Sequence, residues 1–316
     1  MENKIKIVFF ATPDIALESF KFFINSPDYE VLALVTQKAK PQNRGKKIVE
    51  RNITRLAKEN NIKVFEPIKI SKEPEIINEL KSLNADFFIT FAFGQILSQE
   101  VIDIPKFDII NLHASLLPLY RGANPICQCI EDGAKYTGIT TMKTVLALDS
   151  GDICLQEKIE IPLEMNVIDL MEKISSLSPE LLDKTLKGLY NNTLKAIRQD
   201  DSKATFTKKI KKEEKLIDWN MNAFDLHNKI RSMYKINTNH TFFNGKIVKV
   251  LKTIPLEATN CSCGMVEEVA KDGVIVGCKN GAIKLLVVKP EGKAEMQASA
   301  WACGARIKKG DCFTNG

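Results

Sequence analysis

Three polar side chains near the middle of the chain have the types and spacing to act on a carbonyl group. Asn111 and His113 stand at the end of an apolar, β-branched run over 107–112, which predicts a buried strand. Side chains two apart on a strand leave the same face, so the amide and the imidazole would lie side by side. Together they could stabilise a carbonyl oxygen as it becomes an anion, while Asp149 orients the ring or takes a proton.

Each of these residues also has an ordinary structural interpretation. A histidine near a strand end often only satisfies hydrogen bonds in a core, and an asparagine before a turn often only forms that turn. Asp152 competes with Asp149 for the carboxylate role, although Gly151 would let a tight loop present Asp149 inward. The pattern needs no serine or cysteine nucleophile if the substrate brings its own amine.

A longer motif connects these residues to a known family. Asn-x-His-x-Ser-Leu-Leu-Pro at 111–118, followed by Leu-Asp-x-Gly at 148–151, resembles the folate-dependent formyltransferase family. The resemblance implies that Asn111, His113 and Asp149 are catalytic, that 10-formyltetrahydrofolate is the co-substrate and that no metal takes part. It also implies that residues after two strand ends bind the folate: Phe91, Ala92, Phe93, Gly94, Ser115, Leu116, Leu117 and Pro118.

The elements that must position these residues alternate between strands and helices. Apolar runs predict buried strands over 4–10, 31–36, 64–65, 85–91, 107–112, 138–144 and 153–161. Amphipathic spacing predicts helices over 15–24, 51–61, 72–83, 125–133 and 167–189. This alternation indicates an α/β, Rossmann-like catalytic domain over residues 1–190. Because Gly-x-Gly-x-x-Gly is missing after the first strand, we do not expect a bound dinucleotide. Ala11, which stands where the resembling family usually has glycine, leaves the geometry of that first turn open.

The remainder of the chain predicts a second, smaller domain. Residues 191–212 are polar and lysine-rich, so we place an interdomain linker at 191–208. Beyond a helix over 222–233, three turn signals stand between β-rich runs: Asn244-Gly245, Asp272-Gly273 and Asn280-Gly281. They predict a small antiparallel, OB-like β-barrel over residues 209–316, an architecture that often binds nucleic acid.

Positive charge is concentrated in two parts of the chain. The net charge is +6, but residues 201–316 carry 20 Lys or Arg against 12 Asp or Glu, which leaves the first 200 residues at −2. Residues 36–58 hold eight positive charges against one negative charge. Such a concentration of positive charge favours binding of a polyanion. The alternative interpretation is that these side chains only face solvent. The family resemblance implies that Arg44, Lys46 and Lys47 within this basic segment bind the acceptor arm of a tRNA.

The composition disfavours export, a membrane and a metal. Charges interrupt the start of the chain and no run of eighteen apolar residues occurs, so we expect a cytoplasmic protein without membrane contact. The eight cysteines are then expected to be reduced thiols. Two pairs, Cys127-Gln128-Cys129 and Cys261-Ser262-Cys263, have one intervening residue, which is not the spacing typical of zinc ligands.

The resemblance extends over nearly the whole chain and implies one reaction. Segments 211–219 and 289–296 are similar to the carboxyl-terminal domain of the family members that formylate methionyl-tRNA, whereas 234–237 departs from their pattern. We therefore expect a monomer that transfers a formyl group from 10-formyltetrahydrofolate to the α-amine of methionyl initiator tRNA, for translation initiation. The alternatives are an N-formyltransferase for a sugar-nucleotide amine, a 10-formyltetrahydrofolate hydrolase, or a tRNA-binding protein that has lost its activity.

Overall fold

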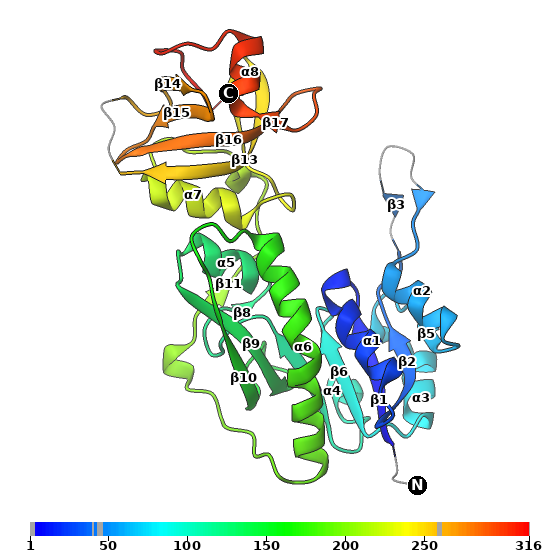
Figure 1. The fold of residues 1–316 in the computed structure, drawn as a ribbon. Helices are drawn as coiled ribbons and strands as arrows, with labels where there is room; N and C mark the ends of the chain where they lie inside the picture. Colours follow the sequence, from blue (N-terminus) through cyan, green and yellow to red (C-terminus); the bar gives the residue numbers. More distant parts are fainter. Residues whose placement is uncertain (1–3, 40, 43–46, 258–260, 316) are drawn as a thin grey trace. The chain divides into compact units, whose positions relative to one another are not determined.

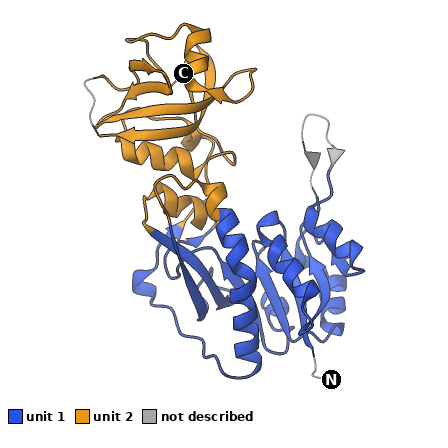
Figure 2. Ribbon diagram, in the orientation of Figure 1, with its two compact units in different colours: residues 1–122, 136–160, 171–206 blue, residues 123–135, 161–170, 207–316 orange. Residues whose placement is uncertain are grey.

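The computed structural model describes residues 4–39, 41–42, 47–257 and 261–315 (Figure 1). By its internal contacts the chain divides into two compact units (Figure 2). Unit 1 comprises residues 1–122, 136–160 and 171–206, and unit 2 comprises residues 123–135, 161–170 and 207–316. These units are groups of residues in mutual contact and need not coincide with folding domains. The predicted domain boundaries at residues 190 and 209 therefore remain predictions.

Unit 1 is built on a mixed sheet of seven described strands in the order β10-β9-β7-β6-β1-β2-β5. Strands β5, β2, β1, β6 and β7 run parallel, β9 pairs antiparallel with β7, and β10 pairs antiparallel with β9. The predicted α/β character is confirmed, and each predicted strand of this domain is present. The strands are β1 (Ile5–Ala11), β2 (Tyr29–Val35), β5 (Lys63–Phe65), β6 (Phe87–Phe91), β7 (Asp108–His113), β9 (Tyr136–Lys143) and β10 (Ile153–Glu160).

Helices cover both faces of this sheet because neighbouring side chains of a strand point to opposite faces. On β1, Phe9 packs against Phe20 of α1 (Leu17–Asn25), with the ring centroids 5.4 Å apart. Phe10 lies on the other face, in a core that also includes α3 (Pro74–Ser82). The other described helical segments here are η1 (Asp14–Ala16), α2 (Asn52–Glu59), η2 (Ile70–Lys72), α4 (Gln99–Ile102), η3 (Asp201–Lys203) and most of α6 (Val167–Tyr190).

Unit 2 contains an antiparallel sheet of six described strands, in which β12-β13-β16-β15-β14 are neighbours and β17 pairs with β16. The three predicted hairpins are confirmed, since each turn signal joins two consecutive strands. Asn244 and Gly245 have positive φ angles of 49° and 71°, as a tight turn between β12 and β13 requires. The strands are β12 (His240–Phe243), β13 (Lys246–Leu256), β14 (Val266–Ala270), β15 (Gly273–Gly277), β16 (Ala282–Pro290) and β17 (Met296–Gln297).

Unit 2 also contains segments from the middle of the chain, which the sequence patterns do not predict. On α7 (Ala223–Ser232), His227 Nε2 donates to the Leu163 carbonyl at 3.0 Å, and Arg231 donates to the Pro162 carbonyl at 3.0 Å. Burial lowers the pKa of His227, which favours the neutral ring. These bonds tie the chain after β10 to this unit. The other described helices of unit 2 are α5 (Pro125–Glu131), η4 (Glu213–Lys215) and α8 (Ala298–Ala305).

Within the described part of the chain, none of the helices is long and apolar enough to cross a membrane. The described residues also contain no group of three or more His, Cys, Asp or Glu side chains that could hold a metal ion. The eight cysteines are free thiols. Burial raises the pKa of Cys127 to about 11 and of Cys154 to about 12, so neither is an activated nucleophile.

Candidate active site

The structure brings the three predicted catalytic residues together in unit 1. Asn111 and His113 lie at the end of β7, opposite Met142 and Thr140 of β9 in the strand register. Asp149 lies in the loop between β9 and β10, and its carboxylate Oδ2 is 3.7 Å from His113 Nδ1. The His113 and Asp149 side chains are 7% and 13% exposed, so their interaction is only weakly screened by solvent.

The hydrogen-bond partner of His113 decides which ring nitrogen carries the proton. Nε2 lies 2.9 Å from the Tyr120 carbonyl, which can only accept, so Nε2 donates. In the neutral ring Nδ1 is therefore unprotonated and faces Asp149. The 3.7 Å between Nδ1 and Asp149 Oδ2 is too long for a hydrogen bond. The ring of His113 thus lies beside a carboxylate, and its Nε2–H is already used by the Tyr120 carbonyl.

The amide of Asn111 is oriented by a threonine on the neighbouring strand. Thr90 Oγ1 on β6 donates to Asn111 Oδ1 at 2.9 Å, in register across the two parallel strands. Among the described residues no acceptor is bonded to Asn111 Nδ2, so this group is free to donate. A free, oriented N–H donor is what an oxyanion site requires. The sequence reasoning missed Thr90, although one polar side chain in the apolar run of β6 was a signal for it.

The Asp149 loop is held in one conformation by backbone contacts. The Gly122 N–H donates to Asp149 Oδ2 at 2.8 Å and so orients the carboxylate. Asp149 has a φ of 46°, a left-handed conformation that non-glycine residues rarely adopt. Gly151 lies against the Lys143 carbonyl, where an added Cβ atom would clash with backbone. The competing residue, Asp152, accepts a backbone hydrogen bond from Lys143 just before β10, at 2.9 Å.

Substituting Gly151 with alanine is expected to destabilise the loop that carries Asp149. The new Cβ would overlap the Lys143 carbonyl, so the loop must move, at a cost of about 1–3 kcal/mol in unfolding free energy. Denaturant unfolding measures this cost. Gly304→Ala in α8 is the matched control, because a Cβ there meets no atom within 4 Å apart from the backbone of its own helix. Equal unfolding free energies for the two variants would contradict the prediction.

Part of the predicted linker is built into this site. Thr205 Oγ1 accepts from the Tyr120 N–H at 2.8 Å, and the Thr205 carbonyl accepts from the Arg121 N–H at 2.8 Å. These bonds support the short strand β8 (Arg121–Gly122) and the residue before it, which contact His113 and Asp149. Composition alone marked this segment only as polar, and its pairing with distant residues is visible only in the fold.

The first predicted folate segment follows β6, whose last residue is buried. Ala92 and Gly94 are exposed and have positive φ angles of 52° and 81°. Phe93 between them is buried and packs edge-on against Phe10, with the ring centroids 5.3 Å apart. The Phe93 carbonyl accepts from the Gln37 side-chain amide at 2.8 Å. The backbone of Ala92 and Gly94 is therefore the part of this segment that a ligand can reach.

The second predicted folate segment follows β7 and forms a bonded turn. Ser115 Oγ donates to the Leu119 carbonyl at 2.6 Å, and Ser115 is completely buried. Leu117 is also buried, and its N–H donates to a threonine of β9 at 3.2 Å. Leu116 and Pro118 are partly exposed. Ser115 and Leu117 thus shape the turn, while the other two residues reach its surface.

The predicted tRNA-binding residues fall largely outside the described part of the chain. Arg44 and Lys46 lie outside the described residues, and Lys47 is described only through its backbone in β4 (Lys47–Ile48). β4 pairs with β3 (Pro41–Gln42) in an antiparallel ladder. The structure therefore describes the basic segment on both sides of residues 43–46, which include Arg44 and Lys46.

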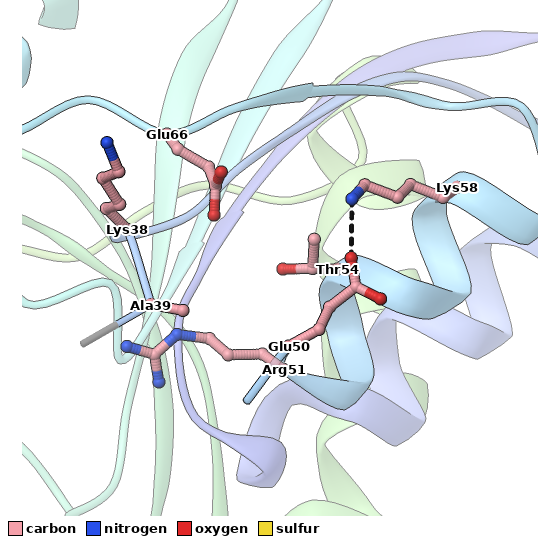
Figure 3. Close-up of a pocket in the computed structure, with 7 residues that line it drawn as sticks. All are labelled: Lys38, Ala39, Glu50, Arg51, Thr54, Lys58 and Glu66. Carbon is pink, nitrogen blue, oxygen red and sulfur yellow. Dashed lines mark hydrogen bonds and ion pairs between the residues drawn. The ribbon is translucent and has the colours of Figure 1, made fainter. Parts of the chain in front are cut away.

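A pocket of about 200 Å³ is lined largely by residues of the basic segment 36–58 (Figure 3). Glu50 and Lys58 form an ion pair at 2.6 Å within it, which raises the pKa of Lys58. Thr54 is buried, and its hydroxyl has no hydrogen-bond partner among the described residues. The lining combines both signs of charge: Lys38, Ala39, Glu50, Arg51, Thr54, Lys58 and Glu66. None of the predicted catalytic residues lines this pocket.

Both parts of the chain match models of one enzyme family. Residues 5–186 match the model described as formyl transferase, and residues 209–306 match the formyl transferase C-terminal domain. The chain belongs to the formyl transferase family. Over 97% of its length it is 38% identical to the methionyl-tRNA formyltransferase of Acetivibrio thermocellus, of which it covers 99%. It is 41% identical to the methionyl-tRNA formyltransferase of Clostridium botulinum over 92% of this chain and 93% of that protein.

Solved structures share the fold at lower sequence identity. A sugar 3N-formyl transferase, crystallised in the presence of dTDP and 5-N-formyl-tetrahydrofolate, superposes with a TM-score of 0.68 and 21% identity over 92% of this chain and 100% of that chain. HypX from Aquifex aeolicus in complex with tetrahydrofolic acid gives 0.64 and 15% over 99% of this chain and 51% of that chain. At these identities the likeness establishes the fold.

Proposed function

We propose that this protein transfers the formyl group of 10-formyltetrahydrofolate to the α-amino group of methionyl initiator tRNA, which yields formylmethionyl-tRNA for translation initiation. The observation that carries the proposal is the full-length similarity to methionyl-tRNA formyltransferases, which includes both family domains. Because translation initiation takes place in the cytoplasm, we place the protein there. As the family resemblance implies, we expect it to act as a monomer.

The reaction begins when the amine of the methionyl group attacks the formyl carbon. A new C–N bond forms and the carbonyl oxygen becomes an anion, which the free Nδ2 group of Asn111 would stabilise. Protonated His113 adds positive charge to the same site, while its Nε2–H remains bonded to the Tyr120 carbonyl. Collapse of the tetrahedral intermediate then breaks the bond between the formyl carbon and the folate nitrogen.

The proton balance of this reaction requires one acceptor and one donor. The attacking amine loses a proton, and the departing folate nitrogen gains one. Asp149 is the proposed acceptor, through a water molecule, because the Gly122 N–H anchors its carboxylate at 2.8 Å beside His113. The same water then returns this proton to the folate nitrogen as the bond between that nitrogen and the formyl carbon breaks, and protonated His113, whose Nδ1 faces the carboxylate, balances the charge of Asp149. No covalent enzyme intermediate and no metal enter the scheme.

We assign the folate to the two strand ends next to these residues. Ala92 and Gly94 offer exposed backbone after β6, and a glycine backbone allows close approach of a ligand. Leu116 and Pro118 offer partly exposed apolar surface after β7. The buried neighbours hold these segments in place: Phe91, Phe93, Ser115 and Leu117.

We assign tRNA binding to the basic segment of unit 1 and to unit 2. The residues of unit 2 carry 20 Lys or Arg against 15 Asp or Glu, and such a surface attracts the phosphates of RNA. We further propose that the antiparallel sheet closes into an OB-like barrel. Bridges from Phe242 to Thr314 and from Met265 to Cys312, which bring the end of the chain onto the sheet, support this closure.

Single-turnover formyl transfer tests the proposal directly. The acceptors compete in one reaction: methionyl initiator tRNA, a sugar-nucleotide amine and water. Rapid formylation of the aminoacyl-tRNA is expected. If the formyl group is transferred only to the sugar amine or only to water, the assignment of methionyl-tRNA as acceptor is wrong. The proposed chemistry at Asn111, His113 and Asp149 would remain.

Replacing Arg44, Lys46 and Lys47 with alanine is expected to weaken tRNA binding, most strongly at low salt. Each residue that contacts a phosphate contributes to counterion release, so the slope of log affinity against log salt should fall by about 2–3. The maximal rate at saturating tRNA should stay close to that of the wild type, because the catalytic residues are unchanged. Filter binding over a salt series measures the slope.

The control for this variant removes the same charge elsewhere. Lys21, Lys81 and Lys184 lie on three other helices or helix ends and are exposed, at 55%, 47% and 59% of their side chains. Their triple alanine variant should keep the slope of the wild type. If both triple variants change the slope equally, binding depends on total charge and the assignment to the basic segment is wrong.

A further inference from the structure

We infer that Gln199 is a positioning residue for the catalytic carboxylate, an inference that rests on the role proposed above for Asp149. Gln199 lies in the segment whose composition predicts a linker, yet only 5% of it is exposed. Its Nε2 group donates to the Asp149 carbonyl at 2.9 Å and to the Gly151 carbonyl at 2.7 Å. Both hydrogens of the amide are therefore used to hold the loop that carries the carboxylate.

The other end of the same amide holds a buried arginine. Gln199 Oε1 accepts from Arg121 Nε at 3.0 Å and from Arg121 Nη2 at 2.7 Å. Arg121 is 4% exposed, and Nη2 also donates to Asp201 Oδ1 at 2.8 Å. Burying a guanidinium costs free energy unless its N–H groups are hydrogen-bonded. The bonds to Gln199 and Asp201 therefore fix the position of the Arg121 side chain.

The network joins the two backbone segments that make the His113–Asp149 pair. Arg121 lies between Tyr120, whose carbonyl accepts from His113 Nε2, and Gly122, whose N–H donates to Asp149 Oδ2. Gln199 bonds to the Arg121 side chain on one side and to the Asp149 backbone on the other. One buried amide thus connects the segment that orients the imidazole with the segment that carries the carboxylate.

Backbone conformation gives a second, independent indication that these segments need support. Tyr120 and Asp149 have φ angles of 60° and 46°, in the left-handed region that non-glycine residues rarely adopt. Such conformations persist only where surrounding contacts fix them, and they concentrate at functional sites. Gln199 supplies two of the contacts that fix the Asp149 loop, and Thr205 supplies one to the Tyr120 N–H.

Gln199→Glu tests the inference with a side chain of the same size. One carboxylate oxygen can still accept from Arg121. The other replaces the Nε2 group, so the Asp149 and Gly151 carbonyls lose their hydrogen-bond donor and face a second acceptor. The Asp149 loop should shift, and because a displacement of about 1 Å can cost a hundredfold in rate, we expect kcat to fall about tenfold to a hundredfold. KM for folate and for tRNA should change little, because Gln199 contacts neither proposed binding surface.

The split between kcat and KM separates positioning from a general loss of structure. Gln199→Met also removes the two donors, without adding charge, and it should likewise lower kcat at nearly unchanged KM. Gln99→Glu on α4, an exposed glutamine bonded to Asp103, is the matched control and should leave both kcat and KM unchanged.

The outcomes distinguish this inference from the proposed function. Wild-type kcat in both Gln199 variants, with Asp149→Asn strongly impaired, would overturn the positioning role and leave the reaction as proposed. The positioning role would also be wrong if the loss of kcat in the two Gln199 variants equals the loss of folded protein measured by thermal unfolding. Failure of the wild type to formylate methionyl-tRNA would instead overturn the proposed function.

Discussion

Replacing Asn111 with alanine is expected to lower the rate of formyl transfer about a hundredfold to a thousandfold, the loss typical of a single oxyanion donor. The physical reason is the free Nδ2 group, which Thr90 holds in place by occupying the amide oxygen at 2.9 Å. The donor acts where negative charge develops, so it stabilises the transition state more than the bound substrate. Single-turnover rates at saturating folate and tRNA measure the loss, and the tRNA dissociation constant should stay unchanged.

Thr90→Val serves as the companion variant. It keeps the shape of the threonine and leaves Asn111 in place, but it removes the hydroxyl that orients the amide. The rate should fall, though less than in Asn111→Ala, because the amide can still rotate into position. A loss of tRNA affinity equal to the loss of rate in Asn111→Ala would refute the assignment of Asn111 to the oxyanion.

Asp149→Asn is expected to lower the transfer rate about a hundredfold to ten-thousandfold, the range over which a positioned acid or base contributes. The substitution is nearly isosteric, and the amide oxygen can still accept from the Gly122 N–H that now bonds Oδ2 at 2.8 Å. What disappears is the negative charge 3.7 Å from His113 Nδ1 and the capacity to accept the amine proton.

Asp152→Asn provides the test between the two carboxylates of this loop. The bond that Asp152 makes to Lys143 uses its backbone carbonyl, so the substitution leaves that bond intact. The rate should remain within about threefold of the wild type, as expected for a residue that takes no part in proton transfer. A large loss in Asp152→Asn together with a small loss in Asp149→Asn would reverse the assignment.

Several parts of the fold follow from local sequence patterns. The run Ile7-Val8-Phe9-Phe10 is apolar on consecutive positions, which is typical of a strand buried on both faces, and β1 is such a strand. Asn244-Gly245 accommodates two positive φ angles, so it places a hairpin between β12 and β13. Both signals depend on a few neighbouring residues, which is why they can be interpreted without the rest of the chain.

The three proposed catalytic residues were also within reach of the sequence, but for a different reason. Asn111 and His113 lie two apart on one strand, so their common face follows from backbone geometry alone. The choice of Asp149 depended on a family motif, and the structure adds the 3.7 Å approach of its carboxylate to His113. The position of a loop carboxylate relative to a strand is set by packing between distant segments.

The sequence by itself thus determined the strands, the hairpins, the family and the residues on one face of β7. Only the tertiary structure decided which way the Asn111 amide points, which nitrogen of His113 carries the proton, and that Gln199 supports the Asp149 loop. The Thr90, Tyr120 and Gln199 bonds that decide these points span 21, 7 and 50 residues of chain. Local patterns record the conformation of neighbouring residues, whereas a hydrogen bond between remote segments exists only once the chain has packed.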